Sequence, residues 1–320
     1  MTLLINTKAV NISLDQVDLT NRDFHVPSFD SFDSLASSIG QLGLLHPPFV
    51  KQTASNNFVP VLGRRRLEVL TRLKADNIEV RVIDSRQPDD QNFLMAFWDN
   101  FERVKRDIAI KAFVVKRFME LVPVETVAKQ ILPFIDVPPQ GPKLERLRRI
   151  GCLEMPVLQA LSNGRIQEKC AFILSRLSSA HQLALLKLIS DLGLNSNKAF
   201  EVISHLFCIS TYLEEPITGL LARPEVLKIL NDSRLALPEK ASELRRLVKR
   251  WAFPDLSQEQ EHFEEWAQQL VPPKDVILRP AQSFEDDSVT VEVRLSSRPT
   301  TEVFLNLIRS FLAENRQEDQ

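Results

Sequence analysis

The chain has 320 residues, of which 44% are hydrophobic and 26% are charged, as expected for a globular protein with more than one domain. Its 8 glycines argue against a Rossmann or P-loop site, which needs glycines at its phosphate turns. No apolar run reaches the roughly 18 residues of a membrane span. The three cysteines lack zinc-ligand spacing, so we expect buried thiols in a reducing, cytoplasmic setting.

The charge is distributed unevenly. Residues 1–100 carry 10 Lys and Arg against 12 Asp and Glu, whereas residues 101–176 carry 14 against 8 and residues 177–320 carry 16 against 22. The middle of the chain is therefore basic while both flanks are acidic. This asymmetry predicts a basic surface for binding nucleic acid that is confined to one domain.

Strand and helix patterns alternate over the first hundred residues. Period-two alternation and turn residues predict strands at 9–20, 47–50, 58–62 and 78–83. Helical periodicity predicts helices at 32–42, 64–74 and 90–99. Gly43 should end the first helix, and Gly63 should separate a strand from the helix that follows it.

Helical periodicity then dominates from about residue 106 to residue 270. Nearly every segment of this stretch is predicted to be helical, for example 107–121, 123–131, 142–150, 156–162, 167–176, 179–191, 196–207, 224–231 and 238–251. A proline-marked linker at 271–274 precedes a predicted strand at 288–295 and a predicted helix at 300–314.

The expected fold class is α+β: a mixed α/β domain, an all-helical bundle of the helix-turn-helix kind, and a small C-terminal β-plus-helix unit. We place the domains at 1–103, 104–210, 211–272 (a helical linker region) and 273–320.

The segment Gly63-Arg64-Arg65-Arg66 places three arginines on the first turn of a helix. Free backbone N–H groups and the positive end of the helix dipole already lie there, so more positive charge does not stabilise the helix. A bound phosphate would explain the cluster, because helix N-termini and arginine both bind phosphate. The alternative is a solvated basic turn that pairs with Asp84 or Asp99.

Two further segments could complete a ligand site. Gly43-Leu44-Leu45-His46-Pro47 links a helix to a strand, so its backbone N–H groups could hold another part of a ligand. Asp99-Asn100-Phe101-Glu102-Arg103 offers side-chain oxygens that suit a hydrated Mg²⁺ on a triphosphate. Each has a simpler interpretation, namely a structural or surface histidine at His46 and an ordinary helix boundary at Asp99.

The order and spacing of these three segments resemble the three boxes of the ParB family's N-terminal domain. Those boxes read Gly-apolar-apolar-(Gln/Glu)-Pro, Gly-Glu-Arg-Arg and Glu-Asn-x-(Gln/Glu)-Arg. The resemblance implies a CTP-binding fold with Mg²⁺, in which the arginine box holds the triphosphate and the last box holds the metal. It implies nucleotide contacts at Gly43, Leu44, His46, Gly63, Arg64, Arg65, Arg66, Asn100 and Arg103, and metal ligands at Asp99 and Asn100; it leaves the catalytic residue unassigned.

The chain departs from the family at three positions. Arg64 stands where the family has Glu, Asp99 where it has Glu, and His46 where it has Gln or Glu. The loss of acidic and amide groups near the phosphates would make it harder to position Mg²⁺ and to activate a water molecule for hydrolysis. We therefore expect nucleotide binding in preference to efficient hydrolysis, and enzyme activity stays open between none and weak CTP hydrolysis.

The basic middle of the chain continues the resemblance. Residues 124–131 resemble the first helix of the ParB helix-turn-helix, and residues 142–150 resemble its recognition helix, although the stretch 132–141 between them is long and proline-rich. Apolar Leu144, Leu147 and Ile150 should face the core. The expected DNA contacts are Lys129, Lys143, Arg146 and Arg149, and the alternative is a solvated helix face.

Two features of the C-terminal half can each be interpreted in two ways. The basic cluster Arg245, Arg246, Lys249 and Arg250 precedes the acidic residues Glu259, Glu261, Glu264 and Glu265. It could pair with them or contact DNA. The C-terminal β-plus-helix unit could form a homodimer contact or dock on the chain's own helices.

The leading hypothesis is a ParB-like clamp on double-stranded DNA in chromosome or plasmid partition, switched by CTP. It would be cytoplasmic, nucleoid-associated and homodimeric, have no membrane partner, and have a ParA-type ATPase as a candidate partner. One alternative is a ParB-fold transcription regulator without nucleotide switching. The other is a nucleotide-processing enzyme on the same scaffold, for which His46 and Asp99 are the candidate base or nucleophile.

Overall fold

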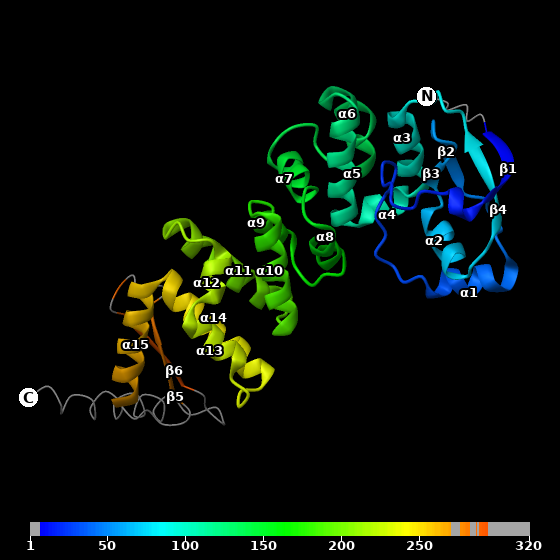
Figure 1. The fold of residues 1–320 in the computed structure, drawn as a ribbon. Helices are drawn as coiled ribbons and strands as arrows, with labels where there is room; N and C mark the ends of the chain where they lie inside the picture. The colour runs from blue at the N-terminus through cyan, green and yellow to red at the C-terminus, as the bar shows by residue number, and fades with distance from the viewer. Residues whose placement is uncertain (1–6, 270–275, 282–285, 287, 294–320) are drawn as a thin grey trace, which may run out of the picture. The chain divides into compact units, whose positions relative to one another are not determined.

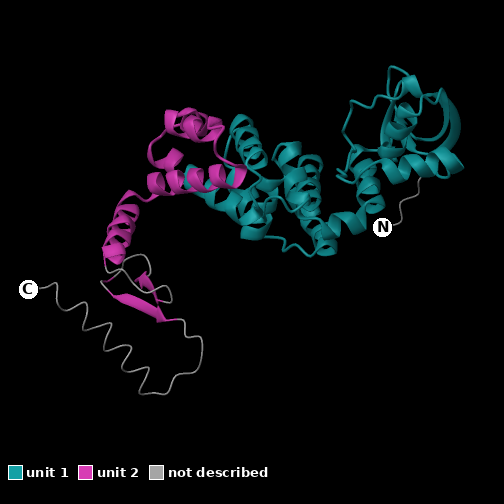
Figure 2. Cartoon of the chain, turned by 90° about the horizontal axis from the view of Figure 1, so that it is seen from below, with its two compact units in different colours: residues 1–207 teal, residues 208–320 magenta. Residues whose placement is uncertain are grey.

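The computed structural model describes residues 7–269, 276–281, 286 and 288–293. The chain divides into two compact units, residues 1–207 and 208–320, which are drawn in teal and magenta in Figure 2. The first unit holds a mixed α/β domain followed by helices, and the second holds helices and a two-stranded sheet (Figure 1).

A four-stranded sheet organises the α/β domain. Its strands are β1 (Thr7–Ser13), β2 (Phe49–Gln52), β3 (Phe58–Leu62) and β4 (Asn77–Ile83), in the order β1-β4-β2-β3. The β2 and β4 strands are parallel, while β1 and β3 pair antiparallel with their neighbours. Asn56, with a φ of 61°, lies in the turn between β2 and β3, a conformation that Asn tolerates better than most residues.

Helices cover both faces of this sheet. On one face, α1 (Asp33–Leu42) and α2 (Arg64–Arg72) share a buried core with the strands, to which they contribute Ile39 and Leu67. The residues of β3 alternate between the faces, and α3 (Asp89–Asp99) packs against this strand. The short helix α4 (Phe101–Arg106) follows α3 after a break at Asn100.

The rest of the first unit is helical. Its elements are α5 (Ile108–Leu121), α6 (Val124–Gln130), the 3₁₀ helix η2 (Leu132–Ile135), α7 (Pro142–Ile150), α8 (Met155–Ser162), α9 (Glu168–Leu174), α10 (Ser179–Asp191) and α11 (Ser196–Tyr212), within which the first unit ends. The Phe118 ring of α5 packs edge-to-face on Phe93 of α3, with the ring centroids 4.8 Å apart. The main packing partners of α7 are α5 and α9.

The second unit contains α12 (Ile217–Ala222), α13 (Pro224–Asn231), α14 (Leu237–Ala252) and α15 (Pro254–Gln269). Two antiparallel strands follow, β5 (Val276–Pro280) and β6 (Val289–Val293). The predicted linker at 271–274 and the predicted helix at 300–314 lie outside the described residues, as does the last part of the predicted strand at 288–295.

The predicted fold class is confirmed, and several elements have the predicted bounds, among them β3, α7, α10 and α13. The strand expected at 47–50 instead begins at Phe49, because Pro47 and Pro48 have no N–H to donate to the sheet. The strand expected at 9–20 ends at Ser13, where a short 3₁₀ helix, η1 (Leu14–Gln16), begins. The sequence patterns missed α4, η1, η2 and β5. They did not delimit α12 and α15, which lie within the stretch 106–270 that was expected to be mostly helical.

Two of the three cysteines contradict the expectation of buried thiols. Cys170 is buried, whereas Cys152 and Cys208 are exposed. Cys152 follows the last turn of α7, where its thiol donates to the Arg148 carbonyl oxygen. No helix in the described part of the chain is both long and apolar enough to cross a membrane.

Gly151 allows the end of α7 to approach α5 closely. A Cβ at this position would lie 2.3 Å from the Ala112 carbonyl oxygen. We expect Gly151→Ala to lower the free energy of unfolding by about 1–3 kcal/mol, because the two helices must separate. Chemical denaturation of the full chain measures this change.

Gly40→Ala is the matched control. Gly40 lies inside α1, and a Cβ there would meet nothing within 4 Å among the described residues. This change should stabilise the protein by about 0.5–1 kcal/mol, since Gly costs a helix backbone entropy. Equal effects of the two substitutions would contradict the close approach of α7 to α5.

Candidate anion-binding site

A cavity of about 200 Å³ lies at the start of α2, beside the junction of α3 and α4. Four arginines and one aspartate line it, so it is strongly cationic. Its lining residues are Phe24, His25, Val26, Leu35, Pro60, Val61, Leu62, Gly63, Arg64, Arg65, Arg66, Ala96, Asp99, Asn100 and Arg103. We call it the arginine cavity.

Gly63 makes the turn from β3 into α2 possible. Its φ of 80° is in the left-handed region, which favours glycine, and a Cβ there would lie 2.8 Å from a guanidinium nitrogen of Arg66. The Arg66 guanidinium therefore lies directly over this glycine. It also donates to the His46 carbonyl oxygen, which joins the first and second of the predicted segments.

The segment 19–31, which we call the strap, has little regular structure and forms part of the cavity wall. Arg64 donates to the carbonyl oxygens of Leu19 and Asn21 and, through Nε, to Glu68 at 2.9 Å. Arg65 donates to the carbonyl oxygen of Asp30 at the other end of the strap. The strap is thus held by guanidinium groups that bind its backbone carbonyls.

Helix α5 supplies a further arginine to the strap. Arg117 donates from Nε and from a terminal nitrogen to the Asp23 carbonyl oxygen, at 3.3 and 3.1 Å. On α4, Arg103 forms an ion pair with the Asp30 carboxylate at 3.7 Å. Arginines of α2, α4 and α5 therefore fix the strap over the arginine cavity.

Two of these arginines keep unused donors. The Nε atoms of Arg65 and Arg103 are buried and have no hydrogen-bond partner among the described residues. A buried polar donor without a partner costs about 1–3 kcal/mol, and more when it is charged. An anion in the cavity would supply the missing acceptors.

The electrostatics of the cavity favour the same occupant. Burial lowers the pKa of the Arg66 guanidinium, and the charge of Asp99 acts in the opposite direction. Burial also lowers the pKa of Arg103, with Asp30 and Asp99 opposing that shift and Arg65 adding to it. Burial therefore makes the charged guanidinium groups costly in free energy, and arginine cannot avoid this cost by losing its proton. A bound anion would reduce the cost.

The third predicted segment is only partly free to hold a metal. The Asn100 side-chain oxygen accepts from Arg103, and its amide nitrogen donates to the Ala96 carbonyl oxygen at 2.7 Å. Asp99 is exposed on the cavity wall, and its carboxylate makes no hydrogen bond within the described residues. Those residues contain no group of three or more His, Cys, Asp or Glu that could hold a metal ion.

The structure brings most of the predicted ligand residues together. Gly63, Arg64, Arg65, Arg66, Asp99, Asn100 and Arg103 all line the arginine cavity. Gly43, Leu44 and His46 do not line it, and His46 reaches it only through the bond from Arg66. The sequence reasoning missed His25, which lies on the strap and carries no periodic signal.

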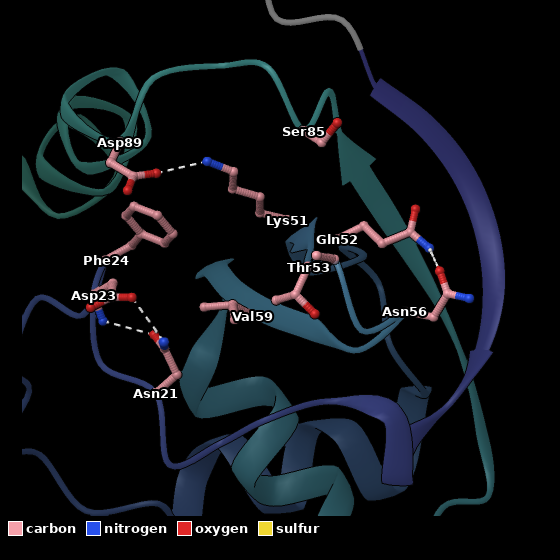
Figure 3. A pocket seen from close by; sticks show the side chains of 11 residues that line it. Asn21, Asp23, Phe24, Lys51, Gln52, Thr53, Asn56, Val59, Ser85 and Asp89 are labelled. Atoms are coloured by element: carbon pink, nitrogen blue, oxygen red, sulfur yellow. Dashed lines mark hydrogen bonds and ion pairs between the residues drawn. The ribbon is translucent and has the colours of Figure 1, made fainter.

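A larger cavity of about 650 Å³ lies on the same domain (Figure 3). Its polar side chains satisfy one another: Lys51 pairs with Asp89 at 2.7 Å, and Gln52 donates to Asn56 at 3.2 Å. Lys51 is the one cation among its described lining residues. This cavity therefore lacks the surplus of positive charge that a phosphate needs.

The predicted DNA contacts are exposed, and the predicted core face of α7 is confirmed, with Leu144, Leu147 and Ile150 buried. Lys143 of α7 donates to the Asp136 carbonyl oxygen at 3.1 Å. Arg146 lies 3.6 Å from Glu168, and Arg149 bonds Glu145 at 2.8 Å.

Lys129 is exposed at the end of α6. The four predicted DNA contacts therefore reach solvent from two helices. Two of them, Arg146 and Arg149, are already engaged in exposed ion pairs, which contribute little free energy and are readily exchanged.

The second basic cluster is engaged within the chain. Arg250 of α14 pairs with Glu261 of α15 at 3.0 Å, and Lys249 donates to the Gln260 side-chain oxygen, also at 3.0 Å. Arg246 pairs with a glutamate on its own helix at 2.6 Å. These contacts favour intramolecular pairing over DNA contact.

The fold and the cavity together define a mixed α/β domain with a cationic pocket suited to phosphate. A model of the ParB N-terminal domain matches residues 4–101. These residues therefore belong to the ParB N-terminal domain family, which confirms the resemblance expected from the three segments.

Solved structures of ParB proteins resemble the chain at low identity. One is the C-terminally truncated chromosome-partitioning protein ParB from Caulobacter crescentus complexed to the centromeric parS site, with 21% identity, 60% of this chain and 96% of that chain covered, and a TM-score of 0.31. The same truncated protein complexed with CTP-gamma-S has 21% identity, coverages of 57% and 98%, and a TM-score of 0.26.

A Pnob8-like ParB-N domain has 18% identity, coverages of 75% and 99%, and a TM-score of 0.34. These TM-scores are low, so the family assignment rests on the match to the domain model. No curated protein sequence matches the chain.

The bonds from Arg64 to the strap lead to a testable expectation. Arg64→Met removes the donors to the carbonyl oxygens of Leu19 and Asn21, so the strap should open more often. We expect amide hydrogen exchange in residues 19–31 to become about tenfold faster or more. Arg86→Met is the control, because Arg86 is exposed and pairs with nearby Asp84. Unchanged exchange in the strap would contradict its attachment by Arg64.

His25 should make stability depend on pH. Burial, together with the charges of Arg64, Arg22 and Arg103, lowers the pKa of His25 from 6.5 to about 3. As pH falls below 6.5, the unfolded chain takes up a proton that the folded chain does not, so stability falls. The loss reaches at most about 2 kcal/mol near pH 5.

Denaturation midpoints measured across this pH range test that expectation. His25→Gln should lose less stability on acidification than the wild type. His262→Gln, at an exposed position on α15, should behave as the wild type does. Equal acid sensitivity of all three proteins would show that His25 is not held neutral by its surroundings.

Proposed function

We propose that the chain is a ParB-type partition protein that binds double-stranded DNA and holds the phosphates of CTP in the arginine cavity. The proposal of nucleotide binding rests on one observation. The Nε donors of Arg65 and Arg103 are buried and have no acceptor among the described residues. Phosphate oxygens are suited to such donors, because charge-assisted bonds to guanidinium are short and strong.

The size of the cavity indicates which part of a nucleotide it takes. At about 200 Å³ it is smaller than the roughly 300–1,000 Å³ of typical small-molecule sites. It therefore suits the phosphate groups, with the nucleoside outside it. CTP is proposed among the nucleotides because the family resemblance implies it, and a ParB protein complexed with CTP-gamma-S is among the similar structures.

The residues offer little support for hydrolysis. Arg64, at the position where the family has Glu, is bonded to the strap carbonyls and to Glu68. The Asn100 oxygen is taken by Arg103, which leaves Asp99 as the carboxylate on the cavity wall. Mg²⁺ often binds through one or two carboxylates and the substrate phosphates, so Asp99 could contribute to holding it. Binding without efficient turnover fits this arrangement.

The DNA half of the proposal rests on the basic middle of the chain and on the exposed residues of α6 and α7. A helix that shows cations to solvent on one side and buries Leu147 on the other can lie against DNA phosphates. The same proposal assigns nucleotide binding to residues 1–103, DNA binding to 104–210, a helical linker to 211–272 and homodimerisation to 273–320. A ParA-type ATPase is the proposed partner.

Isothermal titration with CTP, ATP and GTP in the presence of Mg²⁺ tests the nucleotide half. Wild type should bind CTP, and Arg66→Met or Arg103→Met should weaken binding by about tenfold or more, because each removes a charged donor. Arg106→Met is the control: Arg106 lies one turn from Arg103 but is exposed and pairs with Glu102. If no nucleotide binds while DNA binding persists, a nucleotide-independent regulator would replace this proposal.

DNA affinity measured over a salt series tests the other half. Each lost phosphate contact should reduce the slope of log affinity against log salt by about 0.9. Lys129→Ala and Lys143→Ala should each produce such a change. Arg148→Ala is the control and should not, because Arg148 lies off the face of α7 that carries Lys143, Arg146 and Arg149 at every third position. A wild-type affinity that is independent of salt would contradict phosphate contacts.

A further inference from the structure

We propose that His25 is a phosphate ligand in the arginine cavity and that it takes up a proton from solvent when the phosphate binds. Affinity for a phosphorylated ligand would then rise as the pH falls. This inference rests on the proposed nucleotide function and deepens it, because the family boxes and the arginines alone do not require a titrating group.

The strap fixes the position of His25. Its neighbours Phe24 and Val26 are 4% and 6% exposed, so both side chains are anchored in the interior. The His25 backbone N–H donates to the Arg22 carbonyl oxygen at 3.1 Å. With the strap tied down on both sides by Arg64 and Arg117, the imidazole is held on the cavity wall.

The imidazole has no partner of its own. It is half-buried, and its ring makes no hydrogen bond within the part of the chain that the structure describes. A buried or half-buried histidine usually finds a carboxylate, a carbonyl or water for its ring nitrogens. His25 lines the arginine cavity, so a ligand bound there could supply that partner.

The charged groups around His25 lie on the strap, α2, α3 and α4. They are Arg22 and Asp30 on the strap, Arg64, Arg65 and Arg66 on α2, Asp99 at the end of α3, and Arg103 on α4. Asp30 is already paired with Arg65 and Arg103. The surroundings are therefore cationic, and they keep the imidazole neutral when the cavity holds no anion.

A bound phosphate would reverse this situation. Its negative charge would offset the arginines, and its oxygens would accept hydrogen bonds from the protonated ring. The pKa of His25, held at about 3 without an anion, would move back toward 6.5. At most one proton then passes from solvent to the imidazole for each ligand molecule bound, and no bond in the ligand breaks.

A purely structural role for His25 is the competing interpretation. In that case the ring only fills space in the strap, and a ligand does not change its protonation. The two interpretations differ in the number of protons taken up on ligand binding. If His25 has a purely structural role, its ring contributes nothing to this number.

Isothermal titration of the full chain with CTP and with inorganic pyrophosphate, each in two buffers of different ionisation enthalpy, measures this uptake. At about pH 6 the wild type should take up about half a proton or more beyond the uptake of His25→Gln. Its affinity should exceed that of the variant by about threefold or more near pH 6, and the difference should vanish near pH 8. His262→Gln, on exposed α15, is the matched control and should behave as the wild type.

The outcomes separate the two proposals. Binding by wild type and His25→Gln with the same proton uptake and the same pH profile would overturn the role of His25 and leave the nucleotide site standing. No binding of either probe at either pH would overturn both. If His25→Gln does not fold, the His25 ring resonance of the wild-type chain, titrated with pyrophosphate, must show a raised pKa; an unchanged pKa overturns the inference.

Discussion

The N-terminal domain depends on guanidinium groups that bind backbone carbonyls. Regular elements satisfy their own peptide groups, but the strap at 19–31 has little regular structure and relies on Arg64, Arg65 and Arg117 for several of its carbonyls. These bonds concentrate positive charge beneath the strap. The arginine cavity is thus a consequence of how this segment is attached, and the proposed anion site relies on its spare donors on Arg65 and Arg103.

This dual use of arginine explains the departure from the family at Arg64. Glutamate at that position could not donate to the carbonyl oxygens of Leu19 and Asn21, whereas arginine reaches both and still bonds Glu68 on its own helix. The residue therefore acts mainly as a clamp on the strap. We therefore expect the proposed site to bind phosphate more readily than it hydrolyses it, because arginine replaces an acidic residue of the family at this position.

Much of this arrangement could be predicted from the sequence, because it follows local rules. The strand-glycine-helix turn at Gly63 and the apolar stripe of α7 follow from spacing alone. The strap could not be predicted, since its contacts join residues up to 94 positions apart and its own sequence has no periodicity. His25 was missed for that reason, and the occupation of the Asn100 oxygen by Arg103 depends on side-chain geometry that no motif encodes.

The most direct test of the central claim is a crystal structure of the full chain grown with Mg²⁺ and a slowly hydrolysed CTP analogue. The account predicts phosphate oxygens within hydrogen-bond distance of the Arg65 and Arg103 Nε atoms, which have no other partner among the described residues. Phosphates placed in the larger cavity beside Lys51 and Asp89 would contradict it, as would an arginine cavity that stays without the analogue at saturating concentration.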